Sequence, residues 1–248
     1  MEAIKINGGR AHLNGVSIYS NKGFAQVLLD QKKHQYKIRS GGYKKSQTKF
    51  SKFINFLSKI PFLRSFVLIY KIIRRNWKKF IKALLIYSIL VVILFFSDSP
   101  LSNQVDSVLN NEKVLYLGIM IIVAFLIKIT RVSNYHGAEH MVINYFNENK
   151  DLTFKGLENI SRVSTHCGSL LVIETFIIFY MISFFSSFYD LNFLIAYMIG
   201  YEVFKGQYKI FKPIMFMSYL IQKYFLTAKP SVEELNVAKL ALKKAVLH

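Results

Sequence analysis

The residues with the clearest potential for chemistry are two histidines that lie one helical turn apart. His136 and His140 enclose Glu139 in an H-x-x-E-H pattern. On a helix, residues i and i+4 share a face, so both imidazoles would point to the same side. Neutral imidazoles bind divalent metal ions, and a carboxylate beside a metal-bound water can accept its proton. The pattern is the inverted form of the zinc-protease motif and therefore predicts a divalent metal site, with zinc as the ion and Glu139 as the general base.

Three other residues are candidates for the third metal ligand. Cys167 is the single cysteine of the chain and directly follows His166. A thiolate is a good zinc ligand, and a cytoplasmic position would keep this thiol reduced, as metal binding requires. His166 is the rival of Cys167 because it stands next to it. Glu202 is a further alternative, since inverted zinc peptidases use an acidic ligand downstream of the histidines.

Two glutamates lie within long apolar stretches of the chain. Glu174 follows Cys167 by about two helical turns, and Glu202 follows Tyr201 near the end of a later stretch. Ionisable groups in such stretches are costly and usually functional, so either carboxylate could serve the metal site. The structural alternatives are an ion pair between Glu174 and Lys128, and a position at the water-facing end of a helix for Glu202.

Four apolar stretches are predicted to position these groups, at residues 83–97, 114–129, 168–185 and 191–204. Each is short compared with the roughly 20 residues that a helix needs to cross a bilayer. The last two could instead form a re-entrant pair. The predicted fold class is mainly α, a polytopic membrane helical protein with about four short spans, or two spans and a re-entrant pair. A small N-terminal β region and interfacial amphipathic helices complete it.

The positive charge of the chain is concentrated in its first third. The chain has 33 Lys and Arg against 14 Asp and Glu, and residues 1–82 hold 19 of the basic residues but only two of the acidic ones. A basic block beside an apolar segment stays in the cytoplasm and contacts anionic lipid, which is the predicted partner; nucleic acid is not expected. The charges of the later loops then predict a multi-pass protein of the cell membrane with both termini cytoplasmic. A hydrophobic content of 52% excludes a disordered chain, and one cysteine excludes a disulfide scaffold.

The domain organisation follows from turn signals and amphipathic patterns. Gly8-Gly9 and Asn14-Gly15 mark turns between short strands, whereas Ser231 and Glu234 form the pattern of a capping box at the start of a helix. The first predicted region is a basic cytoplasmic β region with a linker, at residues 1–52, followed by interfacial amphipathic helices at 53–82. A membrane domain at 83–209 comes next, and its cytoplasmic loop 130–167 carries the metal motif. The last region, at 210–248, is an interfacial helix followed by a cytoplasmic helix.

Several short motifs resemble those of the YqhQ family of bacterial membrane proteins, which are described as predicted metal-dependent enzymes of unknown function. The motifs are Gly8-Gly9-Arg10-Ala11, Asn14-Gly15-Val16, Pro61 to Arg64, Tyr135 to His140, Leu152-Thr153, Ser161-Arg162, Cys167-Gly168-Ser169, Tyr201-Glu202, Leu226-Thr227, Pro230 and Val237-Ala238. The resemblance implies metal chemistry and adds Tyr135 and Tyr201 to the candidate site residues. It implies no substrate.

The chain also departs from the pattern of that family. Met141 stands where the family has Lys, and Asn14 stands where it has Glu. The His-Pro-Arg that precedes Cys-Gly in the family is Ser164-Thr165-His166 here. These changes predict a divergent member with an altered substrate or a weakened activity.

Together these features predict an integral membrane metal-dependent enzyme, a zinc hydrolase of peptidase type that acts at the cytoplasmic membrane face. Its substrate would be a membrane-bound peptide or a lipid. A second function class stays open, a non-enzymatic adaptor or assembly factor with a structural His and Cys site, which would have four protein ligands and no open position. A transporter that uses Glu174 and Glu202 as an ion or proton path is the third, and four short spans would be few for it unless the chain forms a homo-oligomer.

Overall fold

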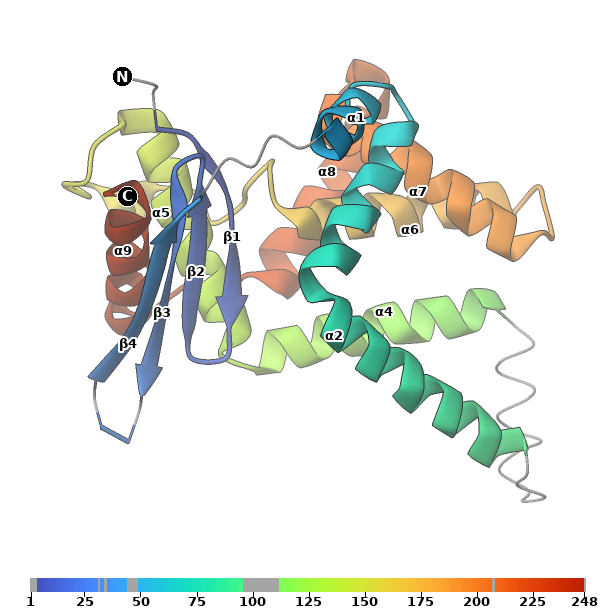
Figure 1. Ribbon diagram of the computed structural model, residues 1–248, viewed down its shortest axis with the longest axis horizontal. Helices are drawn as coiled ribbons and strands as arrows, with labels where there is room; N and C mark the ends of the chain where they lie inside the picture. The colour runs from blue at the N-terminus through green and yellow to red at the C-terminus, as the bar shows by residue number, and fades with distance from the viewer. Residues whose placement is uncertain are drawn as a thin grey trace. The chain divides into compact units, whose positions relative to one another are not determined.

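The computed structural model describes residues 4–30, 32–33, 35–43, 49–95, 112–206 and 208–247 (Figure 1). The chain forms two compact units, each made from separate segments. We call the first the sheet unit; it comprises Met1–Lys45, Ile121–Glu174 and Gln207–His248. The second, the helical unit, comprises Ser46–Met120 and Thr175–Gly206. The two units are described separately below.

The sheet unit begins with a four-stranded antiparallel sheet. Its strands are β1 (Ile6–His12), β2 (Gly15–Ser20), β3 (Gly23–Asp30) and β4 (Gln35–Gly42), in the order β1-β2-β3-β4. A short turn joins β1 to β2 at Asn14-Gly15, as predicted, and another short connection joins β2 to β3. Gly8-Gly9 lies within β1, where the pairing register shifts between Ile6 and Gly8, so the turn predicted there is wrong. Side chains of β3 alternate between buried and half-buried, as expected for a sheet with one covered face. The predicted small N-terminal β region is therefore confirmed.

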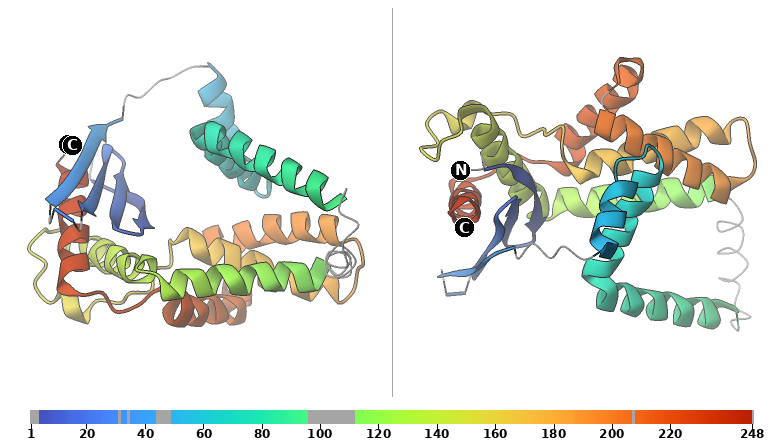
Figure 2. Two further views of the ribbon diagram at one scale, coloured as in Figure 1. Left: turned by 90° about the horizontal axis from the view of Figure 1, so that it is seen from below. Right: turned by 45° about the horizontal axis from the view of Figure 1, so that its top comes forward.

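Two helices cover this sheet (Figure 2). Helix α5 (Val132–Asn149) contacts β1 and β2, helix α9 (Val232–Val246) contacts β2, β3 and β4, and the two helices contact each other. The core between them is apolar because both helices and the sheet point their aliphatic side chains inward. Its fully buried members include Val16, Ile18, Ala25, Val27, Tyr135, Ala138, Val142, Val237, Ala238 and Leu242. The predicted capping box is present at the start of α9, where Ser231 and Glu234 bond reciprocally.

The remaining elements are mainly helical. They are α1 (Lys49–Leu57), α2 (Leu63–Phe95), α4 (Glu112–Ile129), η1 (Leu157–Asn159), α6 (Gly168–Ser183), α7 (Tyr189–Gly206), η2 (Lys209–Phe211), α8 (Lys212–Ile221) and the π-helical turn η3 (Gln222–Leu226). Helices α1, α2 and α7 belong to the helical unit, whereas η1, η2, α8 and η3 belong to the sheet unit. Helix α2 is kinked at Asn76, whose backbone angles are φ −121° and ψ 24°.

The predicted polytopic membrane fold is wrong, although the four apolar stretches are helical where they are described. No single helix in the described ranges is both long and apolar enough to cross a membrane. One pair, Leu117–Ile129 followed by Val132–Asn149, meets the criteria only together, and its helices are bent by 79°. Helix α6 has 16 residues, or about 24 Å at 1.5 Å per residue, against roughly 30 Å of bilayer core. Charged side chains lie near the ends of α4 and α7, the helices that contain the second and the fourth predicted stretch.

Candidate metal centre

Helix α5 places His136 and His140 side by side, as their spacing predicted. Their ring centroids lie 4.3 Å apart. The helix is fixed by the segment after η3, which crosses it at Gly137. The backbone N–H of Ala228 donates a hydrogen bond to the carbonyl of Ser133 at 2.9 Å, and a Cβ atom on Gly137 would overlap the carbonyl of Ala228. Glycine between the two histidines is therefore required for this close approach.

The hydrogen bonds of both histidines fix their tautomers. Nδ1 of His136 lies 3.0 Å from the carbonyl oxygen of Leu226, and Nδ1 of His140 lies 2.7 Å from that of Arg162. Because a carbonyl oxygen only accepts, Nδ1 of each ring must carry the hydrogen and donate it. In the neutral imidazoles, Nε2 is then unprotonated and can accept a hydrogen bond or bind a metal ion. Metal-binding histidines are usually held in this way, by a backbone carbonyl or a carboxylate on the second nitrogen.

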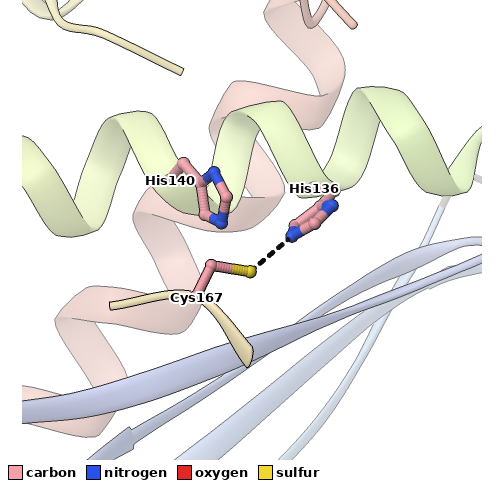
Figure 3. Close-up of side chains that lie close together, drawn as sticks. All are labelled: His136, His140 and Cys167. Atoms are coloured by element: carbon pink, nitrogen blue, oxygen red, sulfur yellow. Dashed lines mark hydrogen bonds between the residues drawn. The ribbon is translucent and has the colours of Figure 1, made fainter. Parts of the chain in front are cut away.

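Cys167 completes the group (Figure 3). Its Sγ lies 3.2 Å from Nε2 of His136, and one ligand atom from each of the three residues lies within 4.8 Å of the others. Nε2 of His140 is buried and has no hydrogen-bond partner in the described parts of the chain. Leaving such a nitrogen unsatisfied costs about 1–3 kcal/mol, which a metal ion would offset. The donor set of two imidazoles and one thiolate fits zinc and leaves one position of a tetrahedron open.

The sulfur of Cys167 is itself oriented by neighbours that the sequence did not indicate. The backbone N–H of Ser169 points at Sγ from 3.5 Å, and the Ser169 hydroxyl lies 3.1 Å away. Gln222 is fully buried and donates from Nε2 to that hydroxyl oxygen at 3.2 Å, so the hydroxyl hydrogen is available for the sulfur. Oε1 of Gln222 accepts from the backbone N–H of Ser164 at 2.9 Å. Gln222 therefore fixes the loop that carries Cys167.

The π-helical turn η3 supports two of the three candidate ligands. The side chain of Gln222 at its first residue reaches the loop of Cys167, and the carbonyl of Leu226 at its last residue holds His136. Thr227 caps the turn, with its N–H and its hydroxyl both donating to the carbonyl of Gln222 at 2.9 and 3.0 Å. π-Helical turns are rare and often occur at functional sites. The signal in the sequence was weak, a glutamine in the mainly apolar stretch 210–225, which also contains Lys212 and Lys223.

Glu139 lies against the first strand of the sheet. Its side chain is 4% exposed, and a Cβ atom on Gly9 of β1 would overlap its carboxylate. Burial raises the pKa of Glu139 to about 7, against the opposing charge of His136. Among the described residues, no hydrogen bond contributes to the pKa of this carboxylate. A carboxyl group with a pKa near neutrality suits an acid and base that gives and takes protons at physiological pH.

Two of the proposed third ligands do not join this group. His166 is exposed, and its Nδ1 bonds to the hydroxyl of Thr165 at 2.8 Å. Glu202 belongs to the helical unit, where it forms a bidentate ion pair with Arg64 and accepts from the N–H of Phe62 at 2.8 Å. Burial would raise the pKa of Glu202, but the hydrogen bonds from Arg64 and Phe62 keep it below its ordinary value. The structure thus gives Glu202 a pairing role rather than the end-of-helix position considered above.

The other three candidates are buried but lie outside the ligand group. Glu174 is 2% exposed, burial raises its pKa to about 7, and it forms no ion pair with Lys128 among the described contacts. Tyr135 is fully buried in the core of the sheet unit, with Arg131 5.6 Å from its ring centroid. Tyr201 is buried in the helical unit, with Arg64 6.0 Å from its ring centroid. Burial raises the pKa of both tyrosines.

Comparison with known proteins places the chain in a family. The family model for DUF1385, a protein of unknown function, matches residues 75–248. A segment of 65 residues is 38% identical to the uncharacterized protein YqhQ of Bacillus subtilis (strain 168), and this segment covers 26% of the chain. The matched segment spans 20% of the length of that relative. No solved structure matches. Because the family model covers well over half of the residues, the protein belongs to the DUF1385 family.

Proposed function

We propose that this protein is a metal-dependent hydrolase whose zinc ion is held by His136, His140 and Cys167. One observation carries the proposal: the Nδ1 hydrogen bonds of both histidines leave Nε2 of each ring unprotonated, and one ligand atom each of His136, His140 and Cys167 lies within 4.8 Å of the others. Three protein ligands leave a coordination position for water, as in catalytic rather than structural zinc sites.

The residues around the ion divide the work of hydrolysis. Zinc, when bound, would supply a water of lowered pKa and would polarise the carbonyl of the substrate. Glu139 would accept the proton of the attacking water and then donate it to the leaving group, as a general base and acid beside a metal-bound water does. Leu226, Arg162 and Ser169 would hold the three ligands in place. A peptide or ester bond in a membrane-bound peptide or a lipid is the proposed target.

Metal content is the direct test. Elemental mass spectrometry of the purified protein should find about one zinc per chain, as expected for a site that holds a single ion. His136→Ala and Cys167→Ser should lose the ion, whereas Glu139→Gln should retain it. His166→Ala is the matched control, because His166 stands next to Cys167 but outside the ligand group. Wild-type protein that stays without stoichiometric metal after reloading would refute the proposal.

A further inference from the structure

We propose that a groove between helices α1 and α2 binds the phosphate headgroup of an anionic phospholipid. The groove lies within the helical unit, so this proposal is independent of the metal site. Its volume is about 340 Å³. It is lined by Ser51, Ile54 and Asn55 of α1 and by Tyr70, Lys71, Arg74 and Arg75 of α2.

The charge of this region cannot be balanced from within its own helices. Residues 49–95 contain no Asp or Glu, whereas residues 49–82 contain ten Lys and Arg. Lys71, Arg74 and Arg75 stand at positions i, i+3 and i+4 of α2, so they share a face, where like charges repel one another. A bound anion would relieve this repulsion. The planar guanidinium groups can bind two phosphate oxygens at once, and such pairs are the strong hydrogen bonds of phosphate recognition.

The first helix supplies polar groups that a phosphate can use. Ser51 and Asn55 are four residues apart on α1 and therefore lie on the same face, toward the groove. A hydroxyl and a side-chain amide are donors that complement the cations across the groove. Phe50 packs edge-to-face on Tyr70, with ring centroids 5.9 Å apart, which fixes the two walls relative to each other.

Exposed aromatic side chains on the two helices that form the groove favour a lipid over a free phosphate or a nucleic acid. Phe50, Phe53 and Phe56 on α1 are 53%, 55% and 59% exposed, and Trp77 on α2 is 53% exposed. Such rings gain nothing from a soluble anion, but they gain free energy when acyl chains or the membrane interface cover them. Helices with Lys and Arg on one face and Phe and Trp on the other lie along the membrane surface. This binding mode requires no spanning helix.

Vesicle flotation tests the groove against simple charge attraction. The full chain would be mixed with vesicles of phosphatidylcholine alone or of phosphatidylcholine with phosphatidylglycerol. The groove variant is Lys71→Gln/Arg74→Gln/Arg75→Gln, and the matched control is Lys78→Gln/Lys79→Gln/Lys82→Gln, which removes three charges from the same helix outside the groove lining. Because each triple variant loses three positive charges, the loss of simple charge attraction to the anionic vesicles should be the same in both. We expect the groove variant to lose about tenfold more affinity than the control, because it also loses charge-assisted hydrogen bonds to the headgroup.

A charge-preserving variant and a competition arm sharpen the result. Arg74→Lys/Arg75→Lys keeps the charge but loses the bidentate geometry, so it should bind the anionic vesicles more weakly than wild type. Circular dichroism would check that each variant is folded. A short-chain, water-soluble phosphatidylglycerol should displace the protein from vesicles better than inorganic phosphate does. Equal losses in the two triple variants, equal binding to both vesicle types, or better competition by inorganic phosphate or single-stranded DNA would each overturn the proposal.

Discussion

Two buried glutamates, Glu139 of the sheet unit and Glu202 of the helical unit, have opposite electrostatic surroundings. Both side chains are largely shielded from solvent, with 4% of Glu139 and 7% of Glu202 exposed. Glu202 has Arg64 and a backbone N–H as partners, and its pKa lies below the ordinary value. Glu139 has no such donors among the described residues, and its pKa rises to about 7. Depth of burial and hydrogen-bond partners together therefore decide whether a carboxylate holds a fold together or stays ready to exchange a proton.

The largest expected effect is on catalysis. Glu139→Gln should reduce the hydrolysis rate by about 10²–10⁴-fold, the usual contribution of a general base, while zinc stays bound. The rate would be measured with fluorogenic peptide and ester substrates. Glu148→Gln at the exposed end of the same helix is the control and should keep the wild-type rate. If the Glu139 variant hydrolyses substrate at the wild-type rate, Glu139 does not exchange protons in catalysis, and its proposed difference from the ion-paired Glu202 is refuted.

The second prediction concerns the stability of the helical unit. Arg64→Ala leaves the carboxylate of Glu202 buried without its ion pair, so the free energy of unfolding should fall by about 3–5 kcal/mol. Chemical denaturation would measure the loss. Replacing both partners, as Arg64→Met/Glu202→Leu, should cost less than Arg64→Ala alone, because no buried charge remains. A single variant as stable as wild type would mean that this pair has no structural role.

Glu174 shows the effect of burial on a carboxyl group that lies outside the candidate metal site. Glu174 is buried like Glu139 but is not in the ligand group, and burial raises its pKa from 4.5 to about 7, with Tyr219 nearby. Below pH 4.5 its carboxyl is protonated in both folded and unfolded chains, so its contribution to stability is fully present there. As the pH rises toward 7 only the unfolded chain ionises, and stability is lost.

Glu174→Gln should remove the decrease in stability that ionisation of this carboxyl causes as the pH rises. Relative to wild type, the variant should become more stable as the pH rises from 4.5 to about 7, by up to about 3 kcal/mol. Above that range the difference should stay constant. Denaturation curves at a series of pH values would measure it. Parallel stability profiles for the two proteins would show that Glu174 has the same pKa in the folded and unfolded chains.

The smallest expected effect tests the groups that orient the ligands. Gln222→Leu removes the donor to Ser169 and the acceptor for Ser164, so zinc affinity should fall about 10–100-fold with the same stoichiometry. Competition with a chelator would measure the affinity. Ser218→Ala is the control, since its hydroxyl is buried but bonds only within its own helix, to Ile214. If both variants bind zinc like wild type, Gln222 does not position the site.

Local patterns were sufficient for the parts of the molecule that local geometry decides. The spacing of His136 and His140 predicted two rings on one face, because an α-helix brings residues i and i+4 together regardless of the rest of the fold. Asn14-Gly15 predicted the turn between β1 and β2, and Ser231 with Glu234 predicted the start of α9, since both signals act within a few residues.

Sequence patterns did not predict which segments far apart in the chain contact each other. His166 and Cys167 are neighbours in the chain, and only the path of the loop before α6 decides that the thiol, and not the imidazole, faces His136. The pairing of Glu202 with Arg64 spans 138 residues, and the carbonyl that orients His136 lies 90 residues away. Apolar composition predicted four membrane spans, but no single helix among the described residues is both long and apolar enough to cross a bilayer. The sequence determined which groups were available for chemistry, whereas tertiary packing decided which of them meet, because side chains far apart in the chain come together only through the backbone that folds between them.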